Sequence, residues 1–187
     1  MIANSNKLIR MQYARYLIVA TMIMTLFSCL NRKSEPKNDN LIIGSSIENI
    51  NSSQYTGFKF NIENEVCLAT INQYFKGYKY KSQFPYSLWI TVETKYKNEN
   101  GHPTGEEAAL FNNLEDSIIS KLDRKTPYCF IGRTTRNGYR EIMFYVSDKE
   151  KAAELLNEFV NEDRFKRKID FNIGLDKTWE SVSGFLE

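Results

Sequence analysis

Two arginines are the residues best suited to bind a charged group. Arg133 and Arg140 flank the Asn-Gly pair at 137–138, and Asn-Gly between strand-like runs is the strongest short signal for a β-hairpin. A guanidinium group binds a carboxylate or a phosphate through two parallel hydrogen bonds. The expected binding surface consists of Tyr128, Arg133, Thr134, Arg140 and Tyr145. The alternative is that the arginines face solvent or pair across strands with Glu93 and Glu141.

Residue types used in catalysis are present, but their spacing does not indicate a catalytic site. His102 is the single histidine and lies in a turn beside a proline, so neither Ser/His/Asp nor Cys/His chemistry is indicated. The acidic pairs 106–107 and 115–116 diverge around a predicted helix, whereas paired acid–base catalysis needs both carboxylates on one substrate. Glu107 falls on the apolar face of that helix, and we interpret it as the capping partner of Thr104. We expect no catalytic residue, metal site or cofactor.

The stretch Lys76–Lys81 is a second candidate for binding. It alternates lysine with tyrosine, which suits contact with an anionic glycan or a lipid headgroup. Such alternation is also typical of a solvated edge strand or loop. The sequence leaves both interpretations open.

Cys67 and Cys129 each lie in a predicted strand. Outside the cytoplasm two thiols can form a disulfide, provided that their strands are neighbours with a suitable Cα separation. The alternative is that both are small buried hydrophobic residues.

The start of the chain has the layout of a bacterial lipoprotein signal. Basic residues precede an apolar run, Tyr16–Phe27, that is too short for the roughly 20 residues of a membrane span. The run ends in Ser28 and Cys29, so we expect residues 1–28 to be a signal peptide and Cys29 to carry acyl groups that anchor the protein. Leu30 in place of an aspartate favours the outer membrane of a two-membrane envelope.

Removal of residues 1–28 changes the charge of the chain. The whole chain has 25 basic and 23 acidic residues, and the signal segment holds three of the basic ones and none of the acidic ones. The mature chain therefore has a formal charge of about −1, whereas a nucleic-acid partner normally needs a strong positive field. We expect the partners to be the membrane, through the N-terminal lipid, and a protein of the cell envelope.

Residues 29–56 are rich in polar residues and predict a tether that carries the lipidated cysteine. Residues 57–187 predict a single domain. Its expected elements are a hairpin over 58–75, a strand over 87–93, a helix over 104–122, strands over 127–135 and 139–146, a helix after a second capping box at 147–150, a strand over 169–173 and a short helix near Trp179.

From Ser87 the predicted order is β-α-β-β-α-β. Two right-handed split crossovers of that order give an antiparallel four-stranded sheet with both helices on one face, which is the ferredoxin-like arrangement. The N-terminal hairpin either extends this sheet or covers its open face. The predicted fold class is therefore α+β.

The order and spacing of several motifs carry a family resemblance. The motifs are Pro103–Glu107, Leu114–Asp116, Tyr128–Thr135, Gly138–Glu141, Phe144–Tyr145 and Asp176–Trp179. From about Ser87 to the C-terminus the chain resembles the bacterial domain of unknown function 695 family, here in lipoprotein form. The resemblance supports the fold and implies no activity.

These observations favour binding over catalysis. We expect a membrane-anchored lipoprotein of the bacterial cell envelope with a non-catalytic interaction or ligand-binding domain. The alternative is a hydrolase-like envelope enzyme that acts on an anionic or glycan substrate.

Overall fold

The computed structural model describes residues 54–187, and the fold is given for these residues. The strands are β1 (Tyr55–Ile62), β2 (Glu65–Asn72), β3 (Tyr86–Glu93), β4 (Tyr128–Arg136), β5 (Tyr139–Val146) and β6 (Ile169–Leu175). The helices are α2 (Gly105–Leu122) and α3 (Lys149–Asn161), with 3-10 helices η3 (Gln73–Phe75), η4 (Lys81–Gln83) and η5 (Glu180–Phe185). The predicted cleavage site and most of the predicted tether lie outside the described residues.

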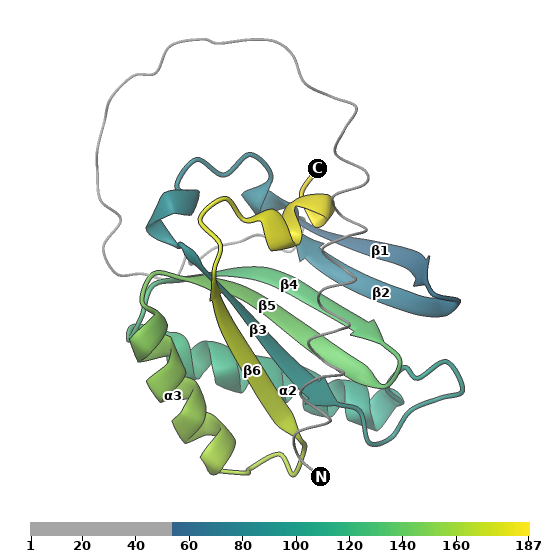
Figure 1. The fold of residues 1–187 in the computed structure, drawn as a ribbon. Helices are drawn as coiled ribbons and strands as arrows, with labels where there is room; N and C mark the ends of the chain where they lie inside the picture. Colours follow the sequence, from purple (N-terminus) through teal and green to yellow (C-terminus); the bar gives the residue numbers. More distant parts are fainter. Residues whose placement is uncertain (1–53) are drawn as a thin grey trace. The chain divides into compact units, whose positions relative to one another are not determined.

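The six strands form one antiparallel sheet in the order β1-β2-β4-β5-β3-β6 (Figure 1). The predicted mixed α+β class is therefore confirmed. The sheet has six strands and not four because β2 pairs with β4, so the N-terminal hairpin extends the sheet and does not cover it.

Both hairpins close through two-residue turns. Glu63 and Asn64 have φ of 51° and 69°, and Asn137 and Gly138 have φ of 47° and 78°. A type I′ turn needs positive φ at both central residues, which asparagine and glycine tolerate best. The predicted hairpin at 137–138 is confirmed.

Helices α2 and α3 cover one face of the sheet, called here the helical face (Figure 1). The predicted apolar stripe of α2 is buried there, because its side chains recur every three or four residues. The main contributors are Leu88, Ile90 and Val92 of β3, Phe111, Leu114, Ile118 and Leu122 of α2, and Leu155, Leu156 and Phe159 of α3.

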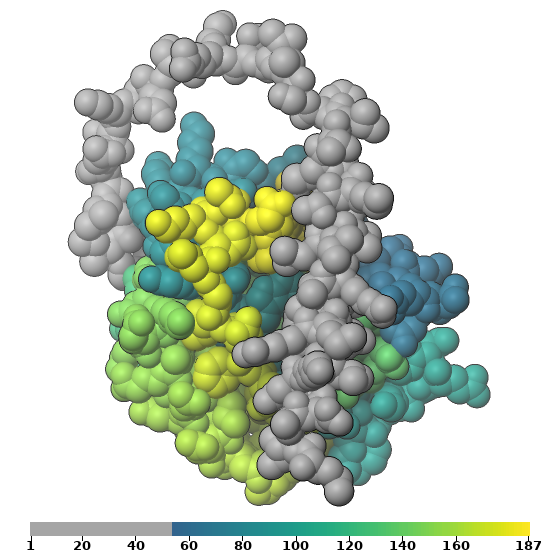
Figure 2. Space-filling model, in the orientation of Figure 1, coloured from purple at the N-terminus to yellow at the C-terminus, as the bar shows by residue number. Residues whose placement is uncertain are grey.

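The opposite face, called here the C-terminal face, is covered in part by residues 73–85 and by η5. Trp179 is fully buried and stacks on Tyr145, with 4.1 Å between ring centroids. Its Nε1 donates to the carbonyl oxygen of Phe84 at 3.0 Å. Figure 2 shows the C-terminal segment lying against residues 73–85, and Gln73 Nε2 donates to the carbonyl oxygen of Phe185 at 3.1 Å.

The two helices begin differently from the predicted capping boxes. Thr104 is the N-cap of α2, but its side chain makes no capping hydrogen bond, and its Oγ1 donates to the carbonyl oxygen of Tyr96 at 3.4 Å. In α3 the cap is Asp148 and not Ser147, because Asp148 Oδ1 accepts from the Lys151 N–H at 2.9 Å. The spacing therefore located both helix starts but misassigned the capping contacts.

Cys67 and Cys129 are free and buried. Their strands are neighbours, as a disulfide requires, but Leu68 lies opposite Thr135, six positions further along β4 than Cys129. Cys67 is one residue further from Cys129 than Leu68 is, so at about 3.4 Å per residue the two cysteines lie more than 20 Å apart along the strands. They do not pair, and burial raises the pKa of the Cys67 thiol to about 11.

Within residues 54–187, neither helix combines the length and apolarity needed to cross a membrane.

Candidate anion-binding site

A β-bulge turns Arg133 toward the helical face. The β4–β5 register shifts between Phe130 and Gly132, so strict alternation is broken just before Arg133. Gly132 has φ of 148°, and a Cβ there would overlap the carbonyl oxygen of Thr70 on β2. Only glycine fits this position, and without the bulge Arg133 would point to the opposite face.

Arg133 meets a carboxylate of α2. Its Nη1 donates to Glu115 Oε1 at 2.6 Å, and 31% of the arginine side chain stays exposed while Glu115 is buried. The second oxygen, Glu115 Oε2, is buried and has no hydrogen-bond partner among residues 54–187. One half of this buried carboxylate is therefore unsatisfied.

Arg140 lies on the same face and is only 8% exposed. Its Nε donates to Thr135 Oγ1 at 3.3 Å, and its guanidinium carbon lies 4.9 Å from the ring centroid of Phe111, a cation–π distance. Its Nη1 is buried and has no hydrogen-bond partner in the described part of the chain. The buried guanidinium thus keeps unused hydrogen-bonding capacity.

Glu115, Arg133 and Arg140 form what we call the two-arginine cluster, with two positive charges and one negative. Burial raises the pKa of Glu115, although both arginines act to lower it. Burial, and then the charge of Arg133, lowers the pKa of Arg140 to about 10. Perturbed pKa values of this kind gather at functional sites. A further anion would compensate the excess positive charge and supply acceptors for the arginines.

Glu107, eight residues earlier on α2, has a complete set of partners. Its Oε1 accepts from the Lys95 N–H at 2.8 Å and from Arg167 Nε at 2.9 Å, and its Oε2 accepts from Arg167 Nη2 at 2.5 Å. Burial acts to raise the pKa of Glu107, but the hydrogen bonds from Arg167 and Lys95 outweigh it and hold the pKa below its ordinary value. The predicted pairing of Glu107 with Thr104 is wrong, because Glu107 pairs with Arg167. That arginine is sixty residues away in sequence, so no local pattern indicates it.

The other three residues of the predicted surface lie elsewhere. Tyr128 is buried on the helical face against Phe144, whereas Tyr145 is buried on the C-terminal face. Thr134 also points to the C-terminal face, where its Oγ1 donates to Glu141 Oε2 at 3.0 Å. Successive strand residues point to opposite faces, so the five residues cannot form one surface. The structure brings together only the two arginines and adds Glu115.

Tyr145 anchors the C-terminal segment. Its hydroxyl donates to Asp176 Oδ2 at 2.6 Å, and Asp176 also accepts from the Glu180 and Ser181 N–H groups at 2.8 and 3.0 Å. Burial raises the pKa of Tyr145, and the hydrogen bond to Asp176 raises it further. The motif Asp176–Trp179 is therefore structural here, because it fixes η5 on the sheet.

His102 and the Lys76–Lys81 stretch take different roles. His102 Nε2 lies 2.9 Å from the carbonyl oxygen of Val66, a hydrogen bond that joins its loop to β2. In the lysine-rich stretch Tyr78 stacks on Trp179, with 5.6 Å between ring centroids, and Lys76 and Lys79 are exposed. The stretch is therefore held against the domain by the contact of Tyr78 with the buried Trp179.

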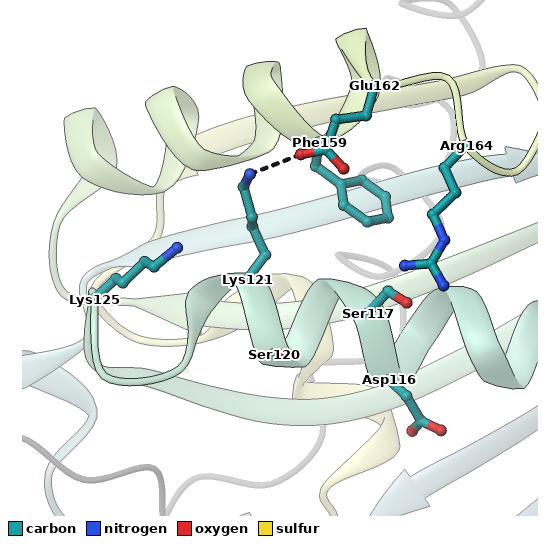
Figure 3. Close-up of a pocket in the computed structure, with 8 residues that line it drawn as sticks. All are labelled: Asp116, Ser117, Ser120, Lys121, Lys125, Phe159, Glu162 and Arg164. Carbon is teal, nitrogen blue, oxygen red and sulfur yellow. Dashed lines mark hydrogen bonds and ion pairs between the residues drawn. The ribbon is translucent and has the colours of Figure 1, made fainter.

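A hollow between α2 and α3 has a volume of about 380 Å³ (Figure 3). Lys121 crosses it to Glu162 at 2.9 Å, while Lys125 and Arg164 lie toward its two ends. Lys125, Glu162 and Arg164 are exposed, and ion pairs at the surface contribute little to stability. No group of three or more His, Cys, Asp or Glu residues within 54–187 is arranged to hold a metal. We therefore place the candidate site at the two-arginine cluster.

Fold and cluster together define an antiparallel α+β domain with a buried two-arginine site. The chain belongs to the family of unknown function DUF695, whose model matches residues 55–186. The match begins at β1, so the N-terminal hairpin is part of the family domain. The motifs that carry the resemblance in the sequence begin only at Pro103. No curated protein and no solved structure matches the chain.

Proposed function

We propose that this protein is a lipid-anchored component of the bacterial cell envelope whose domain binds an anionic group of a partner protein without catalysing a reaction. The observation that carries the proposal is the unsatisfied buried donor Arg140 Nη1 beside the partly exposed Arg133, in a cluster whose two arginines share the single carboxylate of Glu115. Buried polar atoms are normally paired, so this cluster is incomplete without a further partner.

The charge of the cluster supports an anionic partner group. An uncompensated buried charge costs several kcal/mol, and the two arginines share one carboxylate. A second carboxylate or a phosphate that reached Arg133 would complete the charge balance and accept hydrogen bonds from a planar donor fork. Arg133 is the point of entry because its side chain is the most exposed of the three.

The sequence before the domain supports the anchored location. Cys29 follows a short apolar run and Ser28, and the described domain begins only 25 residues later, at Gln54. An envelope location, with the outer membrane favoured by Leu30, makes an envelope protein the expected partner.

We also infer that the part of the domain from β3 to β6 is a ferredoxin-like unit that the β1–β2 hairpin extends. Its support is the chain order β-α-β-β-α-β, the spatial order β4-β5-β3-β6 and the placement of both helices on one face.

In-cell crosslinking of the full-length protein, followed by mass spectrometry, tests the proposed function. Arg133→Gln removes the entry point of the site, while Arg124→Gln removes the same charge from a side chain that is 85% exposed and lies outside the cluster. We expect one dominant envelope partner with the wild type and with Arg124→Gln, and its loss with Arg133→Gln.

A Cys29→Ala variant is the control for location, and the mass of the mature N-terminal peptide reports cleavage and acylation. The partner should be lost when the chain is not anchored. Identical crosslinks from Arg133→Gln and from the wild type would contradict the assignment of the site.

A further inference from the structure

We infer that residues 73–81 form a second contact surface, which lays the domain on an anionic phospholipid bilayer. This inference rests on the proposed membrane anchor, but it concerns a surface remote from the two-arginine cluster. The surface is called here the lysine–tyrosine loop.

The loop presents the two residue types that suit a bilayer surface. Tyr74 and Tyr80 are 42% and 45% exposed, and Lys76 and Lys79 are exposed beside them. Tyrosine has an apolar ring and a polar hydroxyl, so it is enriched at the level of lipid headgroups. Lysine near an anionic leaflet adds about 1 kcal/mol of attraction per residue.

Charge complementarity favours an anionic surface. From Val66 to Val92 the sequence contains Lys76, Lys79 and Lys81 but no aspartate or glutamate. Glu180 and Glu187 are the exposed acidic residues of the C-terminal segment that packs against the loop, and the exposed Lys177 lies three residues before Glu180. The loop itself therefore carries an uninterrupted positive charge.

The loop is held in shape by aromatic contacts. Phe75 is fully buried and lies 5.7 Å from Trp179 between ring centroids, while Tyr78 stacks on the same indole. Tyr80 packs against Tyr78 at 5.7 Å, and Lys81 Nζ lies 5.7 Å from the Trp179 ring centroid. A preformed surface loses less conformational entropy on binding than a mobile one.

The position of the loop fits a membrane-anchored chain. Tyr55, at the start of β1, lies opposite Asn72, which is the N-cap of η3. The chain therefore enters the domain at the end of the sheet that carries the loop. Cys29 is 25 residues before Gln54, and 25 extended residues span at most about 90 Å, so the domain stays near the bilayer.

Lysine footprinting on the full-length protein tests this inference. The protein is reconstituted in vesicles of phosphatidylcholine alone, or with roughly one third phosphatidylglycerol, and an acylating reagent reports the reactivity of each lysine. Lys95 and Lys97 are the internal control, because they are exposed and follow β3 at the opposite end of the sheet.

We expect anionic vesicles to slow acylation of Lys76 and Lys79 about fivefold relative to Lys95 and Lys97, with no such difference on neutral vesicles. High salt should remove the protection, since the attraction is screened. The variant Tyr74→Ser/Tyr80→Ser should weaken it, while Phe75 and Tyr78 still hold the loop against Trp179.

Equal acylation of the two lysine pairs on anionic vesicles would overturn the inference. Protection by a soluble anionic polysaccharide but not by vesicles would assign the loop to a glycan and would also overturn it. The same digest yields the N-terminal peptide. If Cys29 carries no acyl groups, the proposed anchor fails, while protection of Lys76 and Lys79 still decides the bilayer contact.

Discussion

Glu107 and Glu115 lie about two turns apart on α2, and each is buried against an arginine from a distant part of the chain. Glu107 has hydrogen bonds to both oxygens, and its pKa is lowered. Glu115 has one satisfied oxygen, and its pKa is raised. The difference shows that burial of a carboxylate does not by itself mark a functional site. Incomplete compensation of the buried charge is the better indicator.

The largest expected difference in stability between the two sites comes from removing each carboxylate in turn. Glu107→Ala leaves Arg167 buried without its charge partner and should lower the free energy of unfolding by about 3–5 kcal/mol. Glu115→Ala should cost clearly less, because the pair it breaks is only half formed and Arg133 reaches solvent. Urea denaturation of both variants measures the difference, and equal losses would remove the distinction between the two sites.

The arginines provide a second comparison. Arg167→Met removes the partner of a saturated carboxylate and should again cost about 3–5 kcal/mol. Arg140→Met should change stability by only about 1 kcal/mol, because it also removes a buried nitrogen that has no partner and leaves Arg133 on Glu115. Thermal and urea unfolding should rank the two variants in this order. The reverse order would mean that Arg140 is the better compensated residue.

The two carboxylates should give opposite pH dependence of stability. The folded pKa of Glu107 lies below its ordinary 4.5, so its contribution is present above pH 4.5 and is lost as the pH falls through the folded pKa. The folded pKa of Glu115 lies above 4.5, so its ionised form lowers the free energy of unfolding at neutral pH. This penalty disappears as the pH falls from the folded pKa toward 4.5.

Urea unfolding between about pH 3 and pH 7, compared with Glu107→Gln and Glu115→Gln, separates these contributions. The advantage of the wild type over Glu107→Gln should shrink in acid. Relative to Glu115→Gln, the wild type should instead gain stability in acid. If both stability differences changed with pH in the same direction, the two carboxylates would be compensated alike.

The smallest effect on stability is expected for Arg133→Gln. The glutamine amide can still donate a hydrogen bond to Glu115, and Arg140 remains nearby as a counter-charge, so unfolding should change little. Partner capture should nevertheless be lost, because Arg133 is the proposed entry to the site. A large loss of stability would place Arg133 among the structural ion pairs instead.

Local patterns were enough to predict most of the fold. The turn at 137–138, the apolar stripe of α2 and the alternation in β3 are each set by residues near in sequence, and the structure has all three. The covering of the C-terminal face was not predicted, because it depends on Trp179, which packs against Phe75, about a hundred residues earlier in the chain.

The candidate site could be predicted only in part, because its geometry depends on long-range contacts. Arg133 and Arg140 were expected together, but the face that Arg133 occupies is set by the bulge at Gly132. The tight fit of Gly132 against Thr70 depends on the pairing of β2 with β4, which no local pattern shows. Glu115 was considered only as part of an acidic pair that diverges around the helix, and its role was not predicted because its partner lies on a strand and not on its own helix.

Carboxyl carbon NMR of the full-length protein, with Glu107 and Glu115 assigned through their glutamine variants, tests the central claim most directly. We predict that Glu115 titrates above 4.5 and Glu107 below it, because only Glu107 is fully hydrogen-bonded. If Glu115 also titrated below 4.5, its ion pair would be as complete as that of Glu107, and the distinction between the two sites that singles out the two-arginine cluster would be wrong.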